Sequence, residues 1–100
     1  MAFQVEWTGP ARRQFASVVD WIRQDNPTAA FDFRDELFDR IASLGQFPRS
    51  GAIYVRRRGF EVRQITYRKY RVFFRVRPRL KRVEILTVWH GARREPPLRR

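Results

Sequence analysis

The sequence has no cysteine, a single histidine and no long apolar run, and these absences exclude disulfide-bonded, thiolate-metal and membrane-spanning proteins. Without cysteine, the chain can form neither a disulfide framework nor a thiolate metal site. No stretch approaches the roughly 18 apolar residues of a membrane-spanning helix, and the N-terminus lacks the features of a signal peptide. We therefore expect a cytoplasmic protein that has no membrane partner and needs no metal or other cofactor.

The composition is typical of one globular domain. Of the 100 residues, 43% are hydrophobic and 15% are aromatic, which is enough apolar surface for a core. No internal repeat or low-complexity segment divides the chain. We assign residues 1–95 to a single domain and residues 96–100 to a loose, basic C-terminal tail.

The positive charge is concentrated in the second half of the chain. The net charge is +12. Residues 1–50 hold six arginines and seven acids, a net charge of −1, whereas residues 51–100 hold fourteen arginines, two lysines and three acids, a net charge of +13. Such asymmetry predicts a polyanionic partner, which could be nucleic acid, an acidic protein or a membrane surface.

Residues 70–77 alternate strictly between two kinds of side chain, and successive side chains of a strand point to opposite faces. One face is apolar and comprises Tyr70, Val72, Phe74 and Val76. The other is rich in arginine and comprises Arg71, Phe73, Arg75 and Arg77. We expect the apolar face to belong to the core and the arginine face to meet solvent or an anion.

Hydrophobic periodicity predicts seven elements in the order β-α-α-β-β-β-β. The predicted strands are 3–7, 52–56, 60–66, 70–77 and 82–90, and the predicted helices are 9–24 and 27–44. The fold class is therefore α+β: an N-terminal short strand, an antiparallel helical hairpin and then a four-stranded antiparallel meander. The last strand is apolar on both faces, which predicts an interior position.

Four residues mark expected local features. Thr8 and Asn26 are the predicted N-caps of the two helices, since a proline suited to the first turn follows each. Gly45 suits the position just beyond the second helix. Ile65 is out of phase with the apolar residues earlier in its strand, which a bulge would explain.

The residues that could carry chemistry lie in the basic half. His90 ends the last predicted strand, where it either forms part of a site or packs at the strand end. Arg71 could hold a phosphate or carboxylate, or it could be solvated or pair with an acid such as Glu84. The residues that we expect to contact an anionic target are Arg63, Arg71, Arg75, His90 and Arg93.

Four segments of the chain occur together in one known family. They are Asp25–Ala30, Phe47–Gly51, Tyr70–Val76 and Val83–Arg93. In this order they resemble the RelE/ParE toxin superfamily of type II toxin–antitoxin systems, over residues 3–94. The resemblance implies a small antiparallel sheet with a helical hairpin, which is the fold that the periodicity predicts.

The resemblance implies one of two activities. RelE-like members are similar to ribonucleases that cut mRNA on the ribosome, a reaction that needs a base, an acid and cations beside the phosphate. Arg71 matches the family's phosphate-facing arginine, and His90 lies near the acid–base histidine of some members. In a ribonuclease these two residues would be catalytic.

The sequence departs from the RelE pattern at the C-terminus. The tail has no aromatic residue, and the lysines that some members use are absent. The helix joint at 25–30 and the ending at 90–93 resemble ParE more closely. We therefore predict a ParE-like, non-enzymatic toxin that inhibits growth by poisoning DNA gyrase. A RelE-like ribosome-dependent endoribonuclease is the alternative, and a plain nucleic-acid-binding module is a third hypothesis.

The same resemblance implies a cognate acidic antitoxin, ParD-like or RelB-like, in a toxin–antitoxin hetero-oligomer. A partly disordered acidic partner would suit both exposed aromatic residues and basic turns. The residues that we expect it to contact are Trp21, Phe31, Phe38, Arg56 and Arg58. The three aromatic residues could instead be ordinary core, and the arginines could serve to discourage edge-to-edge aggregation.

Overall fold

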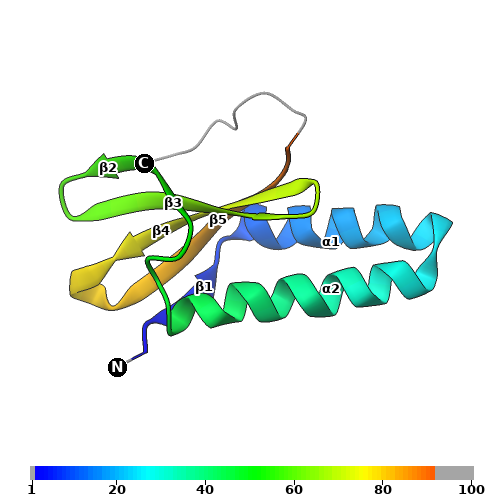
Figure 1. Ribbon diagram of the computed structural model, residues 1–100, viewed down its shortest axis with the longest axis horizontal. Helices are drawn as coiled ribbons and strands as arrows, with labels where there is room; N and C mark the ends of the chain where they lie inside the picture. The colour runs from blue at the N-terminus through cyan, green and yellow to red at the C-terminus, as the bar shows by residue number, and fades with distance from the viewer. Residues whose placement is uncertain (1, 92–100) are drawn as a thin grey trace.

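The computed structural model, which describes residues 2–91, places two antiparallel helices against one face of a five-stranded sheet (Figure 1). The strands are β1 (Gln4–Trp7), β2 (Ala52–Arg57), β3 (Phe60–Tyr67), β4 (Tyr70–Arg77) and β5 (Arg82–His90), and the helices are α1 (Gly9–Asp25) and α2 (Pro27–Ala42). Short 3₁₀ turns, η1 (Ser43–Gly45) and η2 (Pro78–Leu80), follow α2 and β4. The predicted α+β fold is confirmed. Arg93 and the predicted tail at 96–100 lie outside the described residues.

The strand order is β1-β5-β4-β3-β2, so the first strand of the chain pairs with the last. Strands β2 to β5 form the predicted antiparallel meander. Strand β1 runs parallel to β5, with Val5 opposite Val83. Strand β5 is therefore interior, as its apolar residues on both faces predict.

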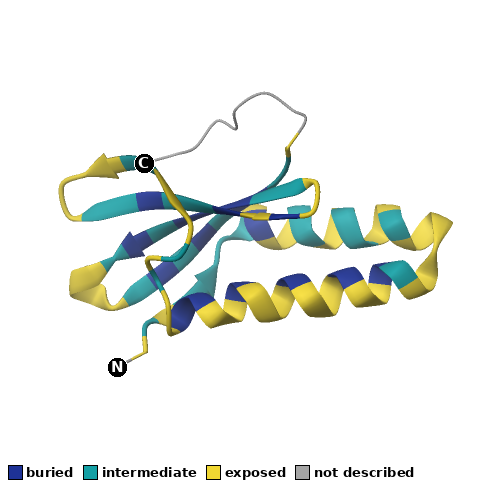
Figure 2. Ribbon diagram, in the orientation of Figure 1, coloured by how far each residue is buried: buried dark blue, intermediate teal, exposed yellow. Residues whose placement is uncertain are grey.

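The core lies between the helices and the face of the sheet that carries the apolar residues of β4. Val72, Phe74 and Val76 are fully buried there, together with Leu37 and Ile41 of α2. The buried residues follow the middle strands and the side of α2 that is turned to the sheet (Figure 2).

Phe73 corrects the expectation of an open arginine face. Its ring is fully buried although it points away from the helices. The ring of Tyr54 packs edge-on at 5.0 Å between centroids, and the guanidinium of Arg71 lies over Phe73 at 4.8 Å. A bulge in β2 between Ile53 and Val55 inserts Tyr54 into this position. The second face of the sheet therefore has a small apolar centre of its own.

The bulge that Ile65 suggested is absent from the β3–β4 ladder, which is regular from Glu61 to Tyr67. Ile65 lies opposite Val72 on the helix-facing side, and Val62 lies opposite Arg75 on the other side. Both apolar residues are buried because each face of this interior strand is covered. Two bulges occur elsewhere, in β2 at Tyr54 and in β5 at Leu86.

Both predicted helix caps are confirmed. The Thr8 hydroxyl accepts a hydrogen bond from the backbone N–H of Ala11 at 3.3 Å and donates one to the carbonyl of Ile85 at 2.7 Å. The Asn26 side chain accepts from Ala29 at 3.0 Å. Thr8 thus ends β1, starts α1 and ties both to β5.

Gly45 has a different role from the expected helix end. Helix α2 ends at Ala42 and continues as the 3₁₀ turn η1, in which Gly45 is buried. The Phe3 N–H donates to the Gly45 carbonyl at 2.7 Å, and a Cβ atom on Gly45 would lie 2.8 Å from the Phe3 carbonyl oxygen. Glycine is needed because the backbone leading into β1 passes this close.

No helix in the described part of the chain is long and apolar enough to cross a membrane.

Substitution Gly45→Ala is expected to lower the free energy of unfolding by about 1–3 kcal/mol, because the added methyl group pushes against backbone and not against a flexible side chain. The measurement is urea denaturation followed by circular dichroism. Gly9→Ala is the matched control, since its Cβ would meet only the movable end of Arg13. Equal effects of the two substitutions would contradict this account of Gly45.

Candidate functional site

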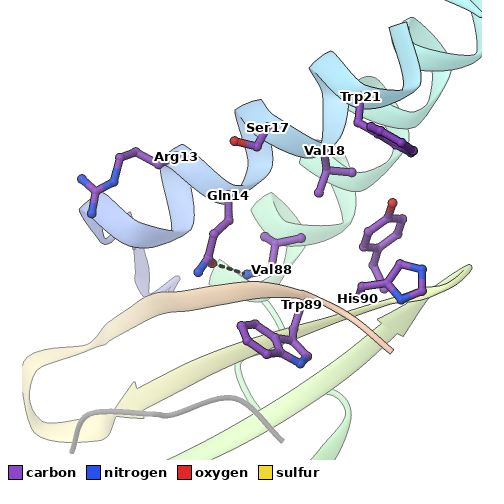
Figure 3. Close-up of a pocket in the computed structure, with 9 residues that line it drawn as sticks. Arg13, Gln14, Ser17, Val18, Trp21, Val88, Trp89 and His90 are labelled. Atoms are coloured by element: carbon purple, nitrogen blue, oxygen red, sulfur yellow. Dashed lines mark hydrogen bonds between the residues drawn. The ribbon is translucent and has the colours of Figure 1, made fainter. Parts of the chain in front are cut away.

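A groove of about 660 Å³ opens between α1 and the end of β5 (Figure 3). Its helix wall carries Arg13, Gln14, Ser17, Val18 and Trp21, and its sheet wall carries Tyr70, Val88, Trp89 and His90. The Trp21 side chain is 72% exposed and lies across the groove from His90 (Figure 3). Exposed aromatic surface beside polar groups is typical of a binding site.

The groove forms because Gln14 joins helix and strand at its inner end. The Gln14 side-chain oxygen accepts hydrogen bonds from the backbone N–H of Val88, at 3.0 Å, and from the hydroxyl of Thr87. Beyond this point both helices continue past the end of the sheet (Figure 1). Trp21 lies on this overhanging part of α1, which explains its exposure.

His90 is held in the groove by ring packing. Its imidazole meets the ring of Tyr70 edge-on at 5.3 Å, and Tyr70 in turn packs edge-on against Phe33 of α2 at 5.3 Å. His90 is therefore half-buried on the helix-facing side of the sheet.

Arg71 projects from the opposite side of the sheet to His90. Its Nε atom donates to the side-chain oxygen of Gln64 at 2.8 Å, and its guanidinium lies over Phe73. Both residues border a shallow recess beside Arg68 and Lys69 at the strand ends. The two residues predicted to act together in a ribonuclease thus approach this recess from different faces.

Arg63 and Arg75 are each bound to a nearby carboxylate, Arg63 to Glu61 of its own strand and Arg75 to Glu84 of the adjacent strand. Arg63 donates to Glu61 at 2.7 Å and to the backbone carbonyls of Arg49 and Gly51 at 2.9 and 3.0 Å. Arg75 donates to Glu84 at 2.6 Å. Both side chains are at most 16% exposed, so each guanidinium holds the sheet and its loops together.

The predicted antitoxin contacts lie on three separate parts of the molecule. Trp21 is on α1, Phe31 and Phe38 are on α2, and Arg56 and Arg58 are on the β2–β3 hairpin. All five are exposed, although the Phe38 ring is stacked on Trp7 at 6.2 Å between centroids. The aromatic residues are therefore not ordinary core.

Sequence reasoning missed the other residues that line the groove. Gln14 and Ser17 are polar residues within a helix, where nothing in the sequence marks a contact to a distant strand. Trp89 offered a signal, since it directly precedes His90 in a strand apolar on both faces. Within residues 2–91, no cluster of histidine and acidic side chains could hold a metal ion.

Comparison with known families decides what kind of protein carries this groove. The family described as "ParE toxin of type II toxin-antitoxin system, parDE" matches residues 5–95. The chain belongs to the ParE toxin family. This ParE-family chain is thus the toxin of a type II toxin–antitoxin system.

Two solved structures have the same fold as this ParE-family toxin. One, from a chromosomal ParDE toxin–antitoxin system of P. aeruginosa, has a TM-score of 0.72 and 19% identity, over 89% of this chain and 96% of that chain. The other, a RelBE toxin–antitoxin complex from Mycobacterium tuberculosis, has a TM-score of 0.54 and 22% identity, over 90% and 99%. No curated protein sequence matches this chain.

The carboxylates that hold the toxin's arginines have shifted pKa values. Burial raises the pKa of Glu84, but hydrogen bonds from Arg77 and Arg75 outweigh burial and leave this pKa below its ordinary value of 4.5. Burial likewise opposes ionisation of Glu61, and Arg63 reverses the effect, so the pKa of Glu61 is also lowered. A lowered folded-state pKa stabilises the fold above the unfolded-state pKa, and this stabilisation is lost as the pH falls.

Substitution Glu84→Gln is expected to lower the free energy of unfolding at pH 7 by about 1–3 kcal/mol, because it leaves Arg75 and Arg77 without their carboxylate. The difference from the unsubstituted toxin should begin to shrink as the pH falls through about 4.5, where Glu84 of the unfolded chain becomes protonated, and should be lost below the lower pKa that Glu84 has in the folded toxin. Urea denaturation across about pH 3–7 measures this difference. Asp35→Asn, at a loose pair with Arg34, is the control and should change stability little. A difference independent of pH would contradict the role of the Glu84 charge.

Proposed function

We propose that this ParE-family toxin inhibits growth by binding and poisoning DNA gyrase, without catalysing a reaction. The observation that carries the proposal is that Arg71 and His90 reach the recess they share from opposite faces of the sheet, each held by partners on its own face. Phosphodiester cleavage needs an acid–base group and a cation at one phosphate. His90 packs on Tyr70 in the helix-facing groove, whereas Arg71 is engaged by Gln64 and Phe73 on the far side.

The surroundings of the other arginines support the same proposal. A phosphate clamp needs guanidinium groups that can turn toward the ligand. Arg63 and Arg75 instead bind Glu61 and Glu84 within the sheet. Because gyrase is a cytoplasmic enzyme, the proposal also places the toxin in the cytoplasm.

We further propose that the antitoxin, ParD-like and acidic, docks on the overhanging end of the helical hairpin. Trp21 and Phe31 flank the short joint between the helices and are 72% and 61% exposed. Large exposed aromatic side chains are the commonest anchors of protein interfaces. The groove beside Trp21 also carries Arg13, which offers a carboxylate of the antitoxin a partner.

Purified gyrase provides the test of the target. Added toxin is expected to inhibit supercoiling of relaxed plasmid and to accumulate linear DNA from the trapped cleavage complex. Toxin preincubated with its antitoxin is the control and should leave supercoiling unchanged. Normal supercoiling at excess toxin would refute the proposal. Cuts in translated mRNA, mapped by primer extension and lost in Arg71→Ala, would establish the ribonuclease alternative.

Substitution Trp21→Ala is expected to weaken antitoxin binding by about 2 kcal/mol, or roughly thirtyfold in Kd. The free energy of unfolding of this variant should barely change, because the Trp21 side chain is mostly exposed. Isothermal titration calorimetry measures the affinity. Ile53→Ala removes another exposed apolar side chain, on β2, and serves as the matched control. Antitoxin binding that is equally tight in both variants would place the interface elsewhere.

A further inference from the structure

Two connections at one end of the sheet bring exposed cations together. In the meander, the β2–β3 turn and the β4–β5 connection lie at the same end, away from the overhanging helices (Figure 1). We define the basic tip as the four residues Arg57, Arg58, Arg79 and Lys81. All four are exposed, and both connections are coloured as exposed in Figure 2.

Phe60 holds the two connections side by side. It is the strand partner of Arg57 at the end of β2. From β4, the guanidinium groups of Arg75 and Arg77 lie over the Phe60 ring at 5.5 and 5.4 Å. The position of one connection relative to the other is therefore fixed by packing.

The charges of the basic tip differ from those of the strands behind it. Arg75 and Arg77 share Glu84, and Arg82 lies 3.3 Å from Glu6. Among the described residues, no carboxylate lies within ion-pair distance of any basic-tip residue. The fold thus neutralises the cations that it buries and leaves those of the tip for an external anion.

The shape and composition of the tip favour a phosphate backbone over a protein partner. Three strand spacings, or about 14 Å, separate β2 from β5. This distance is close to the width of the B-DNA major groove, about 12 Å, and so to the separation of the two phosphate backbones that border the groove. Protein interfaces bury apolar residues at their centre, and the only large exposed apolar side chain described within these two connections is Leu80. The aromatic anchors suited to a protein lie on the helical hairpin.

We infer that the basic tip binds the sugar–phosphate backbone of duplex DNA while the toxin engages gyrase. This inference rests on the proposed function, because gyrase supplies the DNA. The contact is electrostatic and independent of sequence, since Arg58, Arg79 and Lys81 are in short, exposed connections that offer no helix or strand for a groove. It would hold the toxin beside the DNA segment on which gyrase acts.

Fluorescence anisotropy of a labelled DNA duplex of mixed sequence, titrated with the full-length toxin at several salt concentrations, tests the tip without gyrase. The triple variant Arg58→Gln, Arg79→Gln, Lys81→Gln is expected to bind at least about tenfold more weakly at about 100 mM salt. The slope of log K against log salt should fall by roughly 1 for each cation removed.

Two matched variants complete the binding test. The triple variant Arg12→Gln, Arg23→Gln, Arg34→Gln removes the same charge from exposed helix positions and should keep the slope. The double variant Arg58→Lys, Arg79→Lys keeps the charge and should keep the affinity, which separates loss of charge from misfolding. Equal losses in the tip and helix variants, or an unchanged tip variant, would overturn the inference. So would a tip variant that retains DNA binding but loses antitoxin affinity, since the tip would then be an antitoxin surface.

The gyrase cleavage assay distinguishes this inference from the proposed function. If the unsubstituted toxin traps cleavage complexes and the tip variant needs at least about tenfold more protein to do so, both stand. If both proteins are equally potent, the role of the tip at gyrase is overturned while the proposed function stands. If the unsubstituted toxin leaves gyrase unaffected, the proposed function fails and the inferred action at gyrase fails with it, whereas the anisotropy result still shows whether the tip binds DNA.

Discussion

The register between β4 and β5 determines what each face of this toxin presents. A bulge at Leu86 shifts the pairing, so that Phe73 lies opposite Thr87 and Phe74 lies opposite Ile85. Beyond the bulge, Tyr70 meets His90 and Arg71 meets Trp89. Without the extra residue, every side chain after Leu86 would change faces, because the strand period is two. A single inserted residue therefore directs His90 into the groove and separates it from Arg71.

Much of the fold was predictable because its signals are local. The caps Thr8 and Asn26 are read from a few neighbouring residues, and the change of period after the second helix marks where the meander begins. The parallel pairing of β1 with β5 and the close approach of Phe3 to Gly45 join residues far apart in sequence. No local pattern encodes them. The burial of Phe73 was not predicted for the same reason, since the Tyr54 ring that covers Phe73 comes from the bulge in β2.

The candidate site was harder to predict than the fold. Trp21, Phe31 and Phe38 are exposed, as partner contacts must be, and their role in antitoxin binding stays a prediction. The residues predicted to contact an anion lie in different environments. Arg63 and Arg75 are bound to Glu61 and Glu84, and Arg93 lies outside the described residues. The sequence allows Glu84 as a partner for Arg71, but the register brings Arg75 opposite Glu84. Strand alternation gives the face of a residue but not its neighbour across the ladder.

The pairing of the first strand with the last has a consequence for synthesis of the toxin. During translation β1 leaves the ribosome first, yet its only ladder partner in the described sheet is β5, the last strand to emerge. Contacts between residues so distant in sequence form late. The sheet is therefore unfinished, and the groove that His90 completes does not exist, until β5 has been made. An antitoxin that captures the emerging helical hairpin would meet its toxin before the toxin is complete.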